Sequence, residues 1–158
     1  MKEAWFSALG EPLADREKGE LAAYLQGLGL NPAMPLRRVS SWPEAGALCS
    51  SRSDEWWQAE ETERERLERS TKLDPADRDW HDVNSMLHAA AAAAAARAGS
   101  EDAALVYVAA GAASYAAYQA RLARASGAAS GHPFLRKYAL YSGGRWPLGM
   151  YHGAFAIF

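Results

Sequence analysis

The sequence has a single cysteine, Cys49, and this scarcity excludes two kinds of architecture. One cysteine cannot form a disulfide framework within the chain, and it cannot supply a cysteine-based zinc site. A chain without disulfides suits a reducing compartment. Residues 1–6 contain an early acid and no long apolar segment, so we expect no signal peptide. We therefore predict a soluble, cytoplasmic protein.

Long apolar segments and strong net charge are also lacking. The uncharged stretch at residues 103–118 has sixteen residues, fewer than the ~20 that are needed to span a bilayer. The net charge is −2, and no acid follows Asp102, where five lysines and arginines remain. Five bases are too few for a nucleic-acid footprint. We therefore expect neither a membrane nor a nucleic acid as partner.

Familiar catalytic motifs are absent as well. The chain contains no Gly-x-Ser-x-Gly segment, and the glycines at 127 and 131 lack the Lys-Ser/Thr that a phosphate-binding loop requires. Cys49 has no histidine close to it in the sequence, and a lone cysteine is usually a small buried residue. The sequence therefore leaves open whether the protein is an enzyme.

Alanine is what the chain has in abundance. An unbroken alanine run fills residues 89–96, and residues 103–118 are almost entirely small, apolar or aromatic. We predict two antiparallel helices, 75–98 and 101–125, joined at Gly99-Ser100, because so short a turn makes consecutive helices neighbours. A helix that is apolar on all sides is normally buried, so this hairpin is predicted to be the centre of the fold.

Further helices are predicted before the hairpin. Capping residues, early prolines and periodic apolar residues indicate helices at 3–9, 13–28, 43–49 and 54–72. Residues 134–158 are aromatic and glycine-rich, and their pattern does not distinguish helix, short strand and irregular chain. The predicted fold is a mainly α, compact single domain over residues 1–158. It has about five helices, and an irregular or short-β C-terminal segment packs on the hairpin.

One candidate site combines carboxylates and histidines. Trp56, Glu60, Glu63 and Leu67 have the spacing i, i+4, i+7, i+11, which places them on one helix face. Buried carboxylates need a partner or a metal ion. One hypothesis is a divalent metal site or an acid–base site inside the bundle, formed by four residues: Glu60, Glu63, His81 and His88. The other interpretation is that the glutamates form ion pairs with Arg64, Arg78 or Arg97.

A second candidate site is the C-terminal segment. Tryptophan, tyrosine and arginine dominate binding hot spots, and glycine lets a backbone approach a ligand closely. We predict that a pocket or protein-binding patch is formed by Tyr138, Tyr141, Arg145, Trp146, Tyr151 and His152. The alternative is that these aromatic residues cover the alanine-rich helices, whose methyl-sized faces need large side chains packed against them. The two interpretations are compatible.

These observations favour a small, soluble helical binding protein of bacterial type, regulatory or immunity-like, without a cofactor. Its partner would be another protein, which contacts the acidic face of residues 54–82 or the Arg145-Trp146 loop. The alternative is an enzyme or metal-binding protein with a polar Glu/His site in the bundle. The apolar residues 155–158 could pack within the chain or across a homodimer, and the sequence does not decide between them.

Overall fold

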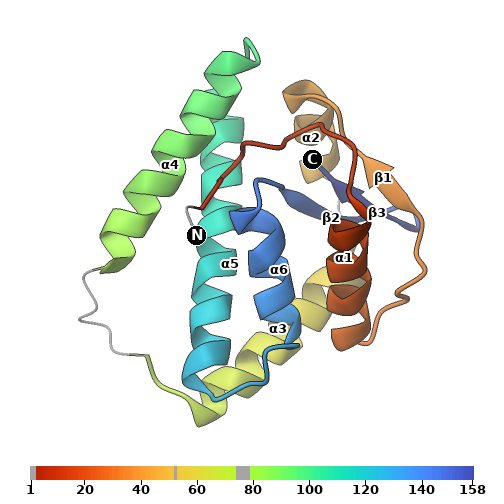
Figure 1. Cartoon of the computed structure of the whole chain (residues 1–158), viewed down its shortest axis with the longest axis vertical. Coiled ribbons are helices and arrows are strands. Elements are labelled where there is room, and N and C mark those ends of the chain that lie inside the picture. Colours follow the sequence, from red (N-terminus) through yellow and green to blue (C-terminus); the bar gives the residue numbers. More distant parts are fainter. Residues whose placement is uncertain (1–2, 52, 74–78) are drawn as a thin grey trace.

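The computed structural model describes residues 3–51, 53–73 and 79–158 (Figure 1). The described residues are mainly helical. They form six helices: α1 (Asp15–Gly27), α2 (Trp42–Cys49), α3 (Asp54–Ser70), α4 (Asp79–Arg97), α5 (Ala103–Ala125) and α6 (Pro133–Ser142). They also form three short strands: β1 (Leu36–Arg38), β2 (Pro147–Tyr151) and β3 (Ala154–Ile157).

Local capping explains where several helices begin. The Ser41 hydroxyl accepts a hydrogen bond from the Glu44 amide at 3.3 Å, which satisfies one of the free N–H groups of α2. Asp102 caps α5 in the same way, with its carboxylate 3.0 Å from the Leu105 nitrogen. Both starts agree with the sequence. The predicted start of the 75–98 helix lies outside the described residues.

The helices α4, α5, α6 and α1 follow one another across the molecule, as Figure 1 shows. Each packs on the next: α4 on α5, α5 on α6, and α6 on α1. The helix α3 crosses this row and packs on α5, while α2 packs on β2. The alanine-rich pair α4 and α5 is therefore antiparallel and adjacent, as predicted. In the described part of the chain, no helix is long and apolar enough to cross a bilayer.

The small sheet brings together segments that are distant in the sequence. Its strand order is β1-β3-β2, with β1 parallel to β3 and β3 antiparallel to β2. The β2–β3 turn contains His152 and Gly153, whose φ angles are +49° and +77°. The predicted short-β C-terminal segment thus forms a hairpin, and β1 adds to it from the other end of the chain.

The helices differ from the prediction in two details. The described residues form six helices, close to the predicted number of about five, but the set differs: residues 133–142, which the sequence left undecided, form α6. Residues 3–9 form turns instead of a helix. Phe6 has a φ of +56°, and the Arg145 guanidinium donates to the carbonyls of Ala8 and Glu11, which holds this segment in a non-helical path.

The expectation that the 101–125 helix is buried on all sides is also wrong. Its alanines at 109, 113, 116 and 120 are fully buried. However, Tyr107 is 69% exposed and Val108 is 47% exposed, and both are on the same helix. The uncharged part of α5, residues 103–120, therefore presents apolar side chains to solvent, and exposed apolar surface of this kind often marks a binding site.

Candidate functional site

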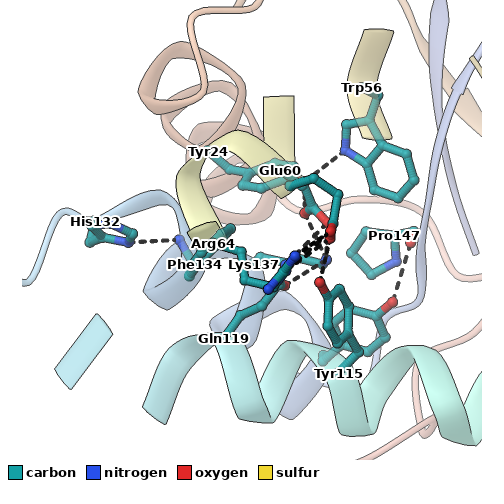
Figure 2. Close-up of polar contacts among 12 residues, drawn as sticks. Tyr24, Trp56, Glu60, Arg64, Tyr115, Gln119, His132, Phe134, Lys137 and Pro147 are labelled. Carbon is teal, nitrogen blue, oxygen red and sulfur yellow. Dashed lines mark hydrogen bonds and ion pairs between the residues drawn. The ribbon is translucent and has the colours of Figure 1, made fainter. Parts of the chain in front are cut away.

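The most unusual buried feature is a group of polar side chains between four helices, which we call the Glu60 cluster. It consists of Tyr24 from α1, Trp56 and Glu60 from α3, Gln119 from α5 and Lys137 from α6 (Figure 2). All five are buried, and Glu60 and Gln119 have no exposed surface. The cluster therefore lies at the point where these four helices meet.

Lys137 and Glu60 form its centre. The ammonium nitrogen of Lys137 lies 2.7 and 2.8 Å from the two carboxylate oxygens of Glu60 and 3.0 Å from the amide oxygen of Gln119. An ammonium group has three hydrogens, so these three acceptors use its whole donor capacity. Figure 2 shows these contacts converging on the Glu60 carboxylate.

Two further side chains complete the hydrogen bonding of the carboxylate. The Tyr24 hydroxyl donates to Glu60 and itself accepts from the Trp56 indole nitrogen at 2.7 Å. The Gln119 amide nitrogen lies 3.4 Å from the other carboxylate oxygen. Burial raises the pKa of Tyr24 well above its ordinary value, and the negative charge of Glu60 raises this pKa further. Tyr24 is therefore a neutral donor at physiological pH.

A buried ion pair contributes little stability on its own, because desolvating its two charges costs several kcal/mol per ion. Apolar residues of similar volume are often as stable or more stable. Lys137 and Glu60 are therefore poorly explained as stabilising residues alone. A fully hydrogen-bonded group of this kind does fix the relative positions of the elements that carry it.

A partly open cavity of about 250 Å³, which we call the aromatic cavity, lies against the Glu60 cluster. Glu60 and Lys137 belong to its lining, together with the thiol residue Cys49 and the small α5 residues Gly111 and Ala112. Its walls are mainly aromatic and consist of Trp56, Trp57, Tyr115, Tyr141, Trp146 and Tyr151. An apolar lining with a few convergent polar groups is typical of small-molecule sites.

The wall formed by Trp56 is held in place from several directions. Its indole N–H is bound to Tyr24, and its ring meets Phe155 edge-on with centroids 6.1 Å apart. Gly149 has a φ of +118°, and a Cβ at this position would lie 2.7 Å from the Trp56 ring. Glycine is therefore required at 149 both for its backbone conformation and for the close approach of the indole.

A second, open feature is the α4–α5 groove, a depression of about 710 Å³ on the exposed side of α5. Its floor is made of small residues, and tyrosines stand at both ends. It is lined by Asn84, Ser85, His88, Tyr107, Ala110, Gly111, Ser114, Tyr115 and Tyr118. A Cβ added to Gly111 would have no neighbour within 4 Å, so the floor is open there. Met86 adds an exposed apolar side chain on α4.

An acidic network on α3 borders one end of the groove. Tyr115 donates a hydrogen bond to Glu61, and Tyr118 donates one to Glu68 at 2.6 Å. Arg64 lies between these two carboxylates and bonds to both. The hydrogen bond from Arg64 is the largest cause that lowers the pKa of Glu61, and the one from Tyr118 has this role for Glu68. Both glutamates are therefore charged at neutral pH.

The four residues of the hypothetical metal site do not come together. Glu60 is paired with Lys137, and Glu63 is bound by Arg66 and by His132, whose Nε2 lies 2.8 Å away. His88 packs its ring on Tyr107 in the groove, and His81 is exposed. The described residues hold no group of three or more histidine, cysteine, aspartate or glutamate side chains placed to bind a metal ion.

The residues predicted for C-terminal binding divide into two sets. Four of the six are buried: Tyr141, Arg145, Trp146 and Tyr151. The Arg145 guanidinium donates to Glu17 at 2.7 Å and to backbone carbonyls of the N-terminal segment. These contacts hold the N-terminal segment in place, and the side chain does not face a partner. The other three line the aromatic cavity. Tyr138 is half-buried against Trp5, and His152 is exposed.

The sequence did not identify three residues of the Glu60 cluster as candidate site residues: Tyr24, Gln119 and Lys137. The available signal was weak. Lys137 is a charged residue inside an otherwise aromatic and apolar segment, and Gln119 follows a long uncharged stretch. Both patterns also occur at exposed positions, so neither identifies a buried group without the packing of α5 on α6.

Comparisons with protein-family models, with curated proteins and with solved structures find no match to this chain.

Proposed function

We propose that this protein is a binding module that holds a basic, amphipathic helix of a partner protein in the α4–α5 groove. The observation that carries this proposal is the open groove on the uncharged part of α5, residues 103–120, with a floor of small residues between tyrosine walls. Binding of an amphipathic helix in an apolar groove is a recurring mode of protein recognition. Its regulatory or immunity-like role in the cytoplasm is part of the same proposal.

The dimensions of the groove favour a helix as the occupant. Tyr107 and Tyr118 are eleven residues apart on α5, which corresponds to about 16 Å, or three helical turns. The floor between them is formed by Ala110, Gly111 and Ser114. Small side chains allow two helix axes to approach to the lower end of the ~8–10 Å range. Tyrosines at both ends supply the residue type that dominates interface energy.

The charge next to the groove favours a basic partner. The helix α3 carries seven acids and three arginines, and its Glu61 and Glu68 are bound directly to the groove tyrosines. Glu65, on the same helix, is exposed. Negative potential of this kind attracts basic side chains and speeds association with them. Lysines or arginines flanking the apolar face of the partner helix would meet this acidic edge.

The test uses a fluorescein-labelled helical model peptide built from leucine and lysine in an amphipathic pattern. A leucine/glutamate peptide with the same pattern is its control. Fluorescence anisotropy should show binding of the lysine peptide and not of the glutamate peptide. The Gly111→Leu variant fills the groove floor and should weaken binding about tenfold or more. Gly19→Leu on α1 is the matched variant, since this glycine is also helical and open, and it should leave binding unchanged.

The outcome that contradicts the proposal is equal binding of the two peptides, or unchanged binding by Gly111→Leu. A second copy of this chain is the other possible occupant of the groove. Analytical ultracentrifugation distinguishes it. A dimer that becomes a monomer in Gly111→Leu would mean that the groove is a homodimer interface, and the partner proposal would then be wrong.

A further inference from the structure

The aromatic cavity is a second candidate binding site, for a small molecule instead of a protein partner. Its volume limits the size of the ligand. An engineered apolar cavity of about 150 Å³ in another protein binds benzene. The aromatic cavity, at about 250 Å³, has room for a molecule larger than one ring. It is smaller than the ~300–1,000 Å³ of sites for drug-sized ligands. Two fused rings fit this range, and a nucleotide does not.

The walls favour a flat, aromatic molecule. Trp56 and Trp57 enclose the cavity from α3, Tyr115 from α5, and Trp146 and Tyr151 from the C-terminal segment. The Trp57 and Tyr115 rings stack on each other, with an angle of 28° and centroids 6.1 Å apart, so the two rings form one aromatic wall and not a slot between them. Flat rings stack on such faces in offset or edge-on arrangements.

The charges at the cavity favour a neutral molecule. Lys137 and Glu60 neutralise each other, and all three hydrogens of the ammonium group are used by Glu60 and Gln119. A ligand anion would have to compete with Glu60 for Lys137. A ligand cation would meet the ammonium group that already lies 5.6 Å from the Trp56 ring centre and 5.8 Å from that of Tyr115. Either charge would lose its hydration without a new partner.

The tyrosines of the cavity favour a ligand that donates a hydrogen bond. The Tyr151 hydroxyl donates to the Leu148 carbonyl at 3.0 Å, and the Tyr141 hydroxyl donates to the Pro147 carbonyl at 3.4 Å. Each hydroxyl proton is thus committed to the backbone. A hydroxyl group whose proton is used in this way can take part in a further hydrogen bond only as an acceptor.

We propose that the aromatic cavity binds a neutral, planar, bicyclic aromatic molecule with one N–H or O–H donor, a ligand of the indole type. The rings stack between the walls from α3, α5 and the C-terminal segment. The donor bonds to the hydroxyl oxygen of Tyr141. Both tyrosines line the aromatic cavity and neither lines the α4–α5 groove, although Gly111 and Tyr115 line both.

The first test is isothermal titration calorimetry with indole as the probe. Indole should bind with a dissociation constant below about 1 mM. The analogue 1-methylindole lacks the donor and should bind about tenfold more weakly. The charged analogues indole-3-acetate and tryptamine should also bind more weakly than indole. No binding of indole, or equal binding of 1-methylindole, overturns the proposal, and tighter binding of either charged analogue overturns its choice of a neutral ligand.

The second test locates the site. Ala112→Phe places a ring in the cavity and should abolish indole binding, whereas Ala104→Phe, at an exposed position of the same helix, should leave it unchanged. A variant with both Tyr141→Phe and Tyr151→Phe keeps the cavity volume and should bind indole and 1-methylindole equally. Unchanged indole binding by a folded Ala112→Phe variant, or a preserved preference for indole in the tyrosine variant, overturns the assignment. If Ala112→Phe does not fold, the tyrosine variant decides.

The same variants separate this proposal from the proposed function. The tyrosine variant should still bind the leucine/lysine peptide, because neither tyrosine lines the groove. Loss of the preference for indole over 1-methylindole, with peptide binding retained, supports the cavity proposal whether or not the groove proposal holds. Loss of peptide binding in this variant would contradict the placement of the peptide in the groove, since neither tyrosine lines it.

Discussion

Replacing Lys137 by methionine tests whether the Glu60 cluster holds the helices together as an ion pair. Methionine has a similar length, so packing changes little, but the substitution removes the charge that faces Glu60. The carboxylate then keeps only the Tyr24 hydroxyl and a 3.4 Å contact with Gln119. Both residues of the pair are almost fully buried, so water cannot replace the ammonium group. Breaking such a pair costs about 3–5 kcal/mol of the free energy of unfolding.

The assay is urea unfolding followed by circular dichroism, with the slope of the transition compared between variants. The loss is large against a total stability of about 5–15 kcal/mol. Adding Glu60→Gln to Lys137→Met removes the uncompensated charge and should restore about 2 kcal/mol or more. The control is Lys18→Met, which removes a solvent-exposed pair with Asp15 and should change stability little. A loss below about 1 kcal/mol for Lys137→Met would refute the reasoning.

Three further predictions concern one glycine and the ionisation of two side chains. Gly149→Ala should destabilise the protein by about 2–5 kcal/mol in thermal unfolding, through its +118° φ and its contact with Trp56. Gly153→Ala, with a φ of +77° and no close neighbour, should cost only about 1–2 kcal/mol. Burial raises the pKa of Glu17, but hydrogen bonds from Arg145 and a backbone amide outweigh it and leave this pKa lowered. Glu17→Gln should therefore destabilise the protein in urea at pH 7. The difference from wild type should shrink as the pH falls below the ordinary glutamate pKa and disappear only below the lowered pKa of the folded state, where the carboxyl is protonated in both states. Burial, helped by Glu3, raises the pKa of Tyr138 to about 12, so stability should fall between pH 10 and 12 as the tyrosine ionises in the unfolded chain first. An ultraviolet titration that finds Tyr138 ionising near pH 10 in the folded protein would contradict this last expectation.

Much of the helical content could be predicted from local sequence. The caps at Ser41 and Asp102 act within three residues, so their effect is visible in the sequence. The spacing on α3 also identifies most of its buried side: Trp56, Glu60 and Leu67 are buried, whereas Glu63, the fourth residue of the predicted face, is partly exposed. Helical periodicity depends only on the order of residues, which explains why these predictions agree with the structure.

The sheet and the candidate sites depend on contacts between distant residues. Glu60 and Lys137 are separated by 77 positions, and Tyr24 reaches Glu60 from another helix. The strand β1 pairs with β3 across more than a hundred residues. No local pattern states which of several lysines or glutamates will meet, because the choice is made by the packing of α1, α3, α5 and α6.

The sequence by itself determined that this is a mainly helical chain with an alanine-rich antiparallel pair, because capping and periodicity are local properties. It also identified the α3 face that contains Glu60. The tertiary structure decided that the partner of Glu60 is Lys137, that Trp146 and Tyr151 line a cavity instead of a surface patch, and that Tyr107 remains exposed. The physical reason is that burial belongs to a position in the folded molecule, and an apolar helix is buried only where another element packs against it.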